Sequence, residues 1–138
     1  MPPKLFPAVK AFIFHEGKVL IVREAPGYTT GTQIGKYDVV GGRMEAGEHI
    51  TDALRREARE EAGLDIEIGQ PFFVNESWPV VNGEPHQIIR IFFRCHAKTA
   101  TVRLGTDHDH YQWIHPADYR LYPIIENLYP AFELLNQS

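Results

Sequence analysis

Three glutamates that share one predicted helix are the residues of this sequence best placed to do chemistry: Glu57, Glu60 and Glu61. The segment Ile50–Ala62 is rich in good helix formers and contains no Gly or Pro, so it predicts a helix. At about 100° per residue, Ile50 and Leu54 define the apolar stripe of that helix, and the glutamates project on or beside the stripe. Unpaired negative charge is expensive there, and a cluster of hard oxygen ligands suits Mg²⁺ or Mn²⁺.

The same helix also fits a simpler interpretation, a charged surface exposed to solvent. Helices rich in Glu and Arg are common, and the pairs Glu57–Glu61 and Arg55–Arg59 could belong to a solvated face with ordinary ion pairs. The helix alone does not decide between a metal site and a solvated face. The residues before it do.

Those residues extend the helix into a longer motif. From Gly42 to Leu64 the chain reads GRMEAGEHITDALRREAREEAGL. This resembles the Nudix box: Gly, five residues, Glu, seven residues, Arg-Glu, an aliphatic residue, any residue, Glu-Glu, any residue, Gly and an aliphatic residue. Ala58 fills the first aliphatic slot, and the other matching positions are Gly42, Glu48, Arg56, Glu57, Glu60, Glu61, Gly63 and Leu64. So many fixed positions at fixed spacing make a specific signal, and the chain is identified as a member of the Nudix family.

The resemblance implies a metal-dependent hydrolase. Members of the family hydrolyse nucleoside diphosphates linked to another group X, with attack of a metal-activated water on a pyrophosphate phosphorus. It implies one to three Mg²⁺ (or Mn²⁺) ions, held by three carboxylates and a backbone carbonyl: Glu57, Glu60, Glu61 and Gly41. By the same resemblance Arg56 is no ligand but pins a box glutamate through a charge-assisted hydrogen bond.

The identity of the general base stays open between three residues. Glu57 is the first choice, because its place beside the apolar stripe would raise its pKa unless a nearby metal lowers it. Asp107 and Glu76 are the alternatives. Asp107 matches an acidic residue that many members carry shortly before a late Trp, and Asp109 is the second match. The predicted catalytic residues are Glu57, Arg56, Glu60 and Asp107.

The residues expected to bind substrate lie both inside and outside the motif: Arg23, Gly42, Glu48, Trp78 and Tyr111. Arg23 matches an arginine that ends the second strand near the substrate phosphates in many members. Glu48 is expected to anchor the loop before the helix. Trp78 and Tyr111 are candidates for stacking on a nucleobase. Ahead of the paired glycines the family usually has Trp and Pro, whereas this chain has Tyr37 and Val40, which leaves the substrate class open.

Other polar residues allow more than one interpretation. The tract Asp107–His110 could bind zinc, but a mobile acidic loop that closes over substrate is the favoured reading beside a site for a hard metal. Lys10 and Arg90 could face either solvent or phosphate. Cys95 stands in an apolar-rich strand and is expected to be a buried structural thiol.

The resemblance does not select X. The chain is short for the ADP-ribose pyrophosphatases that carry an additional N-terminal region, which favours hydrolysis of a nucleoside triphosphate, including an oxidised or non-standard one, to a monophosphate and pyrophosphate. The alternative is an ADP-ribose or nucleotide-sugar pyrophosphatase, for which the position of Pro79 after the box is a weak hint. A nucleotide-sensing module without catalysis is disfavoured, because every box carboxylate is present.

Composition supports one globular domain over residues 1–138 and excludes some partners. Of the 138 residues, 43% are hydrophobic and 23% are charged, and the formal net charge of −4 argues against binding to a nucleic acid polymer. A single cysteine and the absence of a stretch of about 20 apolar residues predict a cytoplasmic protein that does not span a membrane. The expected partner is a small nucleotide, and the protein is expected to be a monomer or homodimer.

The elements that must position these residues are mixed. Strands are predicted over Ala8–Phe14, Lys18–Arg23, Tyr37–Val40, Leu64–Ile68, Pro71–Trp78, His86–Ala97 and Tyr111–Ile114. A loop is predicted over Glu24–Lys36, a helical turn over Pro116–Tyr119, and a terminal helix over Ile124–Leu135 that Pro130 would kink or split. Gly63 is expected to end the central helix. The fold class is α+β, an α/β/α sandwich with a mixed central sheet.

Overall fold

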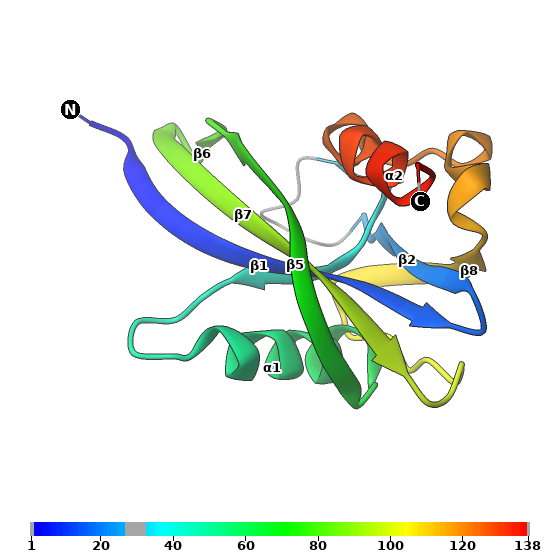
Figure 1. Ribbon diagram of the computed structural model, residues 1–138. Coiled ribbons are helices and arrows are strands. Elements are labelled where there is room, and N and C mark those ends of the chain that lie inside the picture. The colour runs from blue at the N-terminus through cyan, green and yellow to red at the C-terminus, as the bar shows by residue number, and fades with distance from the viewer. Residues whose placement is uncertain (1, 27–32, 138) are drawn as a thin grey trace.

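In the computed structural model, which describes residues 2–26 and 33–137, the strands form a mixed eight-stranded sheet (Figure 1). Its strands are β1 (Lys4–His15), β2 (Lys18–Glu24), β3 (Tyr37–Asp38), β4 (Val40–Arg43), β5 (Ile66–Ser77), β6 (Val80–Val81), β7 (Glu84–Ala97) and β8 (His108–Ile114). The order is β3-β2-β1-β7-β5, and β4 pairs with β1, β6 with β7 and β8 with β2. Only β1 and β7 run parallel among the described pairs; the others are antiparallel.

Helices cover both faces of this sheet. The central helix α1 (Ile50–Ala62) lies on one face, and η1 (Pro116–Leu121), η2 (Glu126–Leu128) and α2 (Tyr129–Leu135) lie on the other (Figure 1). Alternate residues of β1 pack against the helices on opposite faces of the sheet, because side chains along a strand point to opposite faces. Val9 packs with Leu54 on the α1 side, whereas Phe12 packs edge-on against Phe132 of α2, with 5.0 Å between ring centroids. The predicted α/β/α sandwich is confirmed.

Local sequence rules account for the turn between β1 and β2 and for the end of α1. Glu16 and Gly17 both have positive φ, 49° and 78°, in the tight turn between β1 and β2. Gly63 ends α1 in the left-handed conformation, with φ of 65°, and its amide donates to the Arg59 carbonyl at 3.1 Å. The end of α1 at Gly63 agrees with the sequence prediction.

The apolar stripe of α1 begins one turn later than predicted. Ile50 is 38% exposed, so its assignment to the stripe is wrong. The first turn, Ile50–Asp52, is exposed throughout, and contact with the sheet starts at Ala53. The buried side of the helix consists of Ala53, Leu54, Glu57, Ala58 and Ala62. A carboxylate therefore does lie within the buried stripe.

Three other element predictions need correction. The two strands predicted over Leu64–Ile68 and Pro71–Trp78 form one strand, β5, whose register shifts between Ile68 and Phe73. The terminal helix α2 starts only at Tyr129, with Pro130 in its first turn, where a missing amide donor is harmless. Strand β8 starts at His108, so most of the predicted loop Asp107–His110 is paired with β2. The predicted loop Glu24–Lys36 lies partly outside the described residues.

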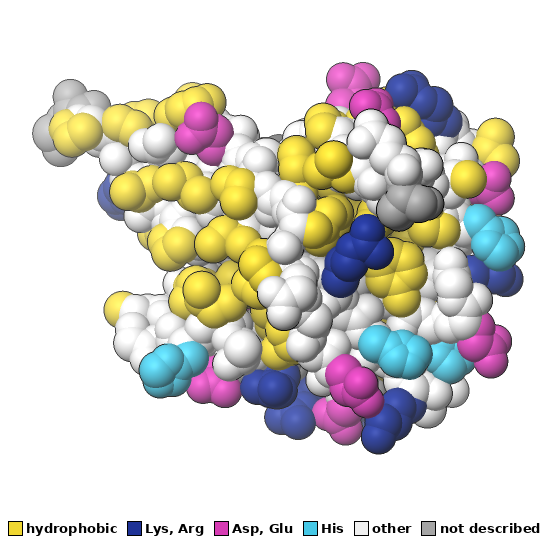
Figure 2. All heavy atoms as spheres, viewed as in Figure 1, with side chains coloured by type: hydrophobic (Ala, Val, Ile, Leu, Met, Phe, Trp, Pro, Cys, Tyr) yellow, Lys and Arg dark blue, Asp and Glu magenta, His cyan; other side chains and the backbone are white. Residues whose placement is uncertain are grey.

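Apolar side chains also remain exposed at one end of the sheet. Figure 2 shows hydrophobic side chains gathered over β5 and the β6–β7 hairpin, where Val74 and Val80 are 60% and 66% exposed. No helix within the described ranges is long and apolar enough to cross a membrane.

Candidate active site

A cleft of about 1220 Å³ is lined on one side by residues of the last two turns of α1 and on the other by residues of the sheet. Glu57, Glu60 and Glu61 form its acidic wall. The opposite walls come from β1, β4, β5, β7 and the segment before β8, and they include Lys10, Gly41, Gly42, Arg43, Trp78, Arg90, Asp107 and His108. Residues far apart in the sequence thus face one cavity.

The three glutamates differ in burial. Glu57 is 8% exposed and Glu61 is half-buried, whereas the Glu60 side chain is 60% exposed. Glu60, which neighbours the buried Ala53 in helical projection, is therefore the most exposed of the three. Burial raises the pKa of Glu57, although the Arg56 guanidinium opposes that shift. Burial also raises the pKa of Glu61 to about 8; the charge of Glu57 adds to the shift, and the Lys10 ammonium opposes it.

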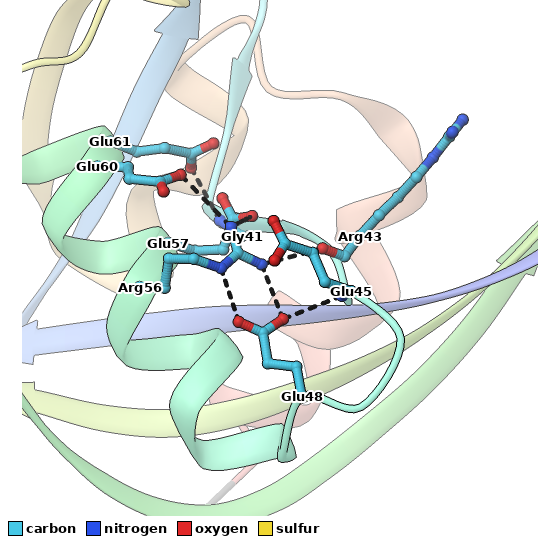
Figure 3. Close-up of polar contacts among 8 residues, drawn as sticks. All are labelled: Gly41, Arg43, Glu45, Glu48, Arg56, Glu57, Glu60 and Glu61. Carbon is cyan, nitrogen blue, oxygen red and sulfur yellow. Dashed lines mark hydrogen bonds and ion pairs between the residues drawn. The ribbon is translucent and has the colours of Figure 1, made fainter.

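Arg56 holds the carboxylates around it in place (Figure 3). Its Nε and Nη2 donate to the two oxygens of Glu48 at 2.7 and 3.0 Å, which is a bidentate pair. Its Nη1 donates to Glu57 at 2.9 Å and to Glu60 at 3.4 Å. The guanidinium lowers the pKa of Glu48 to about 2, and these carboxylates raise the pKa of Arg56. Arg56 therefore fixes both the loop before α1 and the orientation of Glu57.

The paired glycines let β4 approach the acidic helix. The Gly41 amide donates to Glu61 Oε1 at 2.9 Å. A Cβ at Gly41 would collide with the Val9 carbonyl of β1, and a Cβ at Gly42 would lie 2.8 Å from Glu57 Oε1. A side chain at either position would displace a neighbour on the site, which explains why two glycines stand here.

Lys10 is a cleft residue that sequence reasoning left undecided. It is 7% exposed, and its Nζ donates to Asp38 Oδ2 at 3.1 Å. Its charge acts on the pKa of both Glu57 and Glu61. The signal in the sequence was a lysine inside the apolar run of β1, because a buried ammonium requires an acidic partner.

The remaining predicted residues divide into two groups. Asp107 and Trp78 line the cleft, and the Trp78 residue is 59% exposed there. Arg23 instead pairs with Asp109 at 2.8 Å outside the lining, and Tyr111 packs on the core beneath α1. Strand alternation explains the position of Arg23, because it is the neighbour of the cleft residue Glu24 on β2 and faces another surface. Tyr111 pairs with Val22, which belongs to the core on the α1 side.

The positions of Glu76 and His108 test two further predictions from the sequence. Glu76, an alternative base, is exposed on β5 and is not part of the cleft lining. His108 lies in the cleft, and burial lowers the pKa of its imidazole. Among the described residues, its Nδ1 is a buried polar atom without a hydrogen-bond partner. The segment from His108 onward belongs to strand β8, whose first residue lines the cleft, and is not the mobile loop that the sequence predicted.

The donor set fits a hard divalent cation in its chemistry, because all three side chains offer carboxylate oxygens. Glu57, Glu60 and Glu61 are spaced three and four residues apart, which puts their carboxylates on neighbouring positions of one helical surface. As they lie, no group of three or more His, Cys, Asp or Glu side chains within residues 2–26 and 33–137 converges on one point. Glu57 and Glu60 turn to Arg56, and Glu61 turns to the Gly41 amide (Figure 3). The raised pKa values mark an acidic pair that a cation would stabilise.

Comparison with known proteins agrees with this geometry. Residues 4–135 match the family model of the NUDIX domain. The chain is 30% identical over 113 residues to the nucleoside triphosphatase NudI of Escherichia coli (strain K12 / DH10B), which covers 77% of this chain and 79% of that protein. It is 34% identical over 105 residues to an octanoyltransferase of Myxococcus xanthus, covering 72% of this chain but only 27% of the relative's length. The MutT protein from Methanosarcina mazei Go1 has the same fold, with a TM-score of 0.84, 22% identity and coverage of 100% and 99% of the two chains.

Proposed function

Because the chain belongs to the Nudix family of pyrophosphohydrolases, we propose that it hydrolyses a nucleoside triphosphate, including an oxidised or non-standard one, to a monophosphate and pyrophosphate. Enzymes of this family generally use divalent metals and act on small nucleotides. The proposal adds the metal, Mg²⁺ or Mn²⁺ in one to three ions, and the substrate class.

One observation carries the metal assignment. Glu57 is buried and Glu61 is half-buried on the wall of a large cleft, and burial raises the pKa of each. A fold that needed only a packed helix would place Leu or Ala there, since burying carboxylates is unfavourable. A hard cation in the cleft supplies the compensating charge.

The residues of the chain then have distinct tasks. Glu57, Glu60, Glu61 and the Gly41 carbonyl hold the cation, which when bound polarises phosphoryl oxygens and lowers the pKa of a bound water. Arg56 orients Glu57 through the hydrogen bond at 2.9 Å and ties it to Glu48. A residue that positions a ligand in this way improves the geometry of the site without touching substrate.

Glu57 is the proposed general base, with Asp107 as the alternative on the facing wall. The raised pKa of Glu57 suits a group that must accept a proton near neutral pH. Gly42 leaves space beside the Glu57 carboxylate, and Trp78 offers an exposed ring for stacking on a nucleobase. Arg23 is reassigned to an ion pair with Asp109, and Tyr111 to packing.

The similarity to a nucleoside triphosphatase over most of both chains favours the triphosphate substrate. The second candidate, an ADP-ribose or nucleotide-sugar pyrophosphatase, is supported by Pro79, which lines the same cleft. A small nucleotide is the proposed partner, in preference to a nucleic acid polymer. The cytoplasmic location, the single domain over residues 1–138 and the state of monomer or homodimer stay predictions from the sequence.

A panel of nucleotides tests the proposal. The purified protein is incubated with dNTPs, oxidised dNTPs, ADP-ribose, nucleotide sugars and dinucleoside polyphosphates in Mg²⁺ or Mn²⁺, and products are identified by phosphorus NMR. Hydrolysis in ¹⁸O-labelled water shows which phosphorus is attacked. The proposal expects pyrophosphate from a triphosphate and no turnover in excess EDTA. Nucleotide binding without any release of phosphate would instead indicate a sensor.

A further inference from the structure

Two arginines that line the cleft stand on either side of a small residue of β1. Ala8 of β1 pairs with Arg43 of β4 on one side and with Arg90 of β7 on the other. Directly paired residues project to the same face of a sheet, so the two arginine side chains leave the sheet on the same face, on either side of the Ala8 methyl group. Both arginines line the cleft, and Ala8 is only 4% exposed. The cleft thus has a cationic side chain on each of the two strands that border β1 at this position.

Arg90 is half-buried without a carboxylate partner. Within the described parts of the chain its side-chain hydrogen bond is a long one, from Nη1 to Asn75 Oδ1 at 3.4 Å. Burial lowers the pKa of Arg90, and the charge of Asp38 opposes the shift from a distance beyond an ion pair. A guanidinium removed from water in this way is stabilised by an anion that can use its remaining N–H groups.

Arg43 is held in position by neutral groups. Its guanidinium lies over the Phe6 ring, with 4.0 Å to the centroid, and Nη2 donates to His86 Nδ1 at 2.9 Å. His86 must accept through Nδ1, because a guanidinium has no acceptor atom. Figure 3 shows the Arg43 side chain pointing away from the glutamates. Neither contact neutralises its charge, and among the described residues it has no carboxylate within 4.0 Å.

Two lysines of the cleft lining are already paired. Lys10 contacts Asp38 at 3.1 Å, and Lys4 contacts Glu84 at 2.7 Å. Arg43 and Arg90 differ from them in keeping both a fixed position and unused donors. Planar guanidinium groups bind phosphate in a bidentate manner, which suits this arrangement.

We propose that Arg43 and Arg90 form a diphosphate cradle across Ala8, which binds the substrate phosphates that the acidic helix does not hold. The inference rests on the proposed function, because it takes the anion to be the phosphate chain of the nucleotide. The cleft then has two halves of opposite charge: carboxylates on α1 for the cation, and guanidinium groups on the sheet for the phosphates. Substrate binding depends on both.

Calorimetric titration with methylenediphosphonate, a diphosphate analogue that is not hydrolysed, tests the cradle in Mg²⁺ buffer of fixed ionic strength. Arg43→Gln and Arg90→Gln are each expected to weaken binding about tenfold or more, the effect of losing hydrogen bonds to a charged group. The matched control is Arg94→Gln. Arg94 stands on the same strand and face as Arg90, is exposed, and contacts the Phe72 ring outside the cleft. This control should bind as the wild type does.

Lysine variants separate charge from folding. Arg43→Lys and Arg90→Lys keep a positive charge but lose the planar fork, so they should recover part of the affinity. Thermal unfolding of every variant is measured alongside. Equal affinity of the wild type and both glutamine variants, loss in only one of the two, or no binding to the wild type overturns the cradle.

The failure of the cradle differs from a failure of the proposed function. Diphosphonate binding that needs both arginines, in a protein that hydrolyses no nucleotide, would support the cradle and contradict the enzyme. Nucleotide hydrolysis with unchanged KM in both glutamine variants would support the enzyme and contradict the cradle.

Discussion

Replacing Glu61 with Gln should stabilise the metal-free protein at alkaline pH. Burial raises the pKa of Glu61 from 4.5 to about 8. The folded protein therefore holds a proton that the unfolded chain has released, and the free energy of unfolding falls as the pH rises between these two values. In the wild type, Glu61 accepts a hydrogen bond from the Gly41 amide at 2.9 Å. The amide oxygen of Gln can accept the same hydrogen bond, but Gln carries no charge that would have to be buried.

The size of the effect follows from the shift. At about 1.4 kcal/mol per pKa unit, the change from 4.5 to about 8 sets an upper limit of roughly 4–5 kcal/mol. Glu61 is only half-buried, so contact with water reduces this value. We expect Glu61→Gln to be more stable than the wild type by about 2–3 kcal/mol at pH 8 and by less than about 1 kcal/mol at pH 5.

Urea unfolding in EDTA, followed by circular dichroism across this pH range, measures the difference. Glu60→Gln is the matched control, because the Glu60 side chain is 60% exposed and its replacement should leave stability unchanged at both pH values. Added Mg²⁺ should stabilise the wild type more than Glu61→Gln. A Glu61→Gln protein that is no more stable than the wild type at pH 8 would refute the reasoning from buried charge.

Further substitutions test the roles of neighbouring residues. Glu57→Gln should lower kcat by roughly 10²–10⁴-fold with an unchanged circular dichroism spectrum, as measured by steady-state kinetics. Arg56→Lys loses the bidentate contact with Glu48 at 2.7 and 3.0 Å and should lower kcat about tenfold or more; Arg55→Lys, an exposed neighbour, should not. In Gly42→Ala the new methyl group would lie 2.8 Å from Glu57 Oε1, so displacement of that carboxylate should reduce kcat about 10²-fold while KM changes little.

The sequence predicted what local rules govern. The helix between Ile50 and Ala62 and its end at Gly63 depend on nearby residues, and the structure confirms both. The motif also predicted that Glu57 and Glu61 lie close together on one helix, and both line the same wall of the cleft. Spacing along a helix is enough to place such residues together.

Tertiary contacts decided the rest. The exposure of Ile50 depends on where α1 leaves the sheet, which periodicity does not specify. Strand β8 extends to His108 because β2 offers a partner there. Lys10 and Arg90 reach one cleft only because β1 and β7 pair in parallel, a long-range contact without a local signal. Tyr111 faces the core for the same kind of reason, through its pairing with Val22.

Titration of the protein with Mn²⁺, followed by calorimetry, tests most directly whether the acidic wall of the cleft is a metal site. The account predicts that the wild type binds Mn²⁺ and that Glu57→Gln and Glu61→Gln each weaken binding about tenfold or more, while Glu133→Gln on α2, exposed and remote from the cleft, has no effect. Equal Mn²⁺ affinity in all four proteins, or no binding to the wild type, would contradict it.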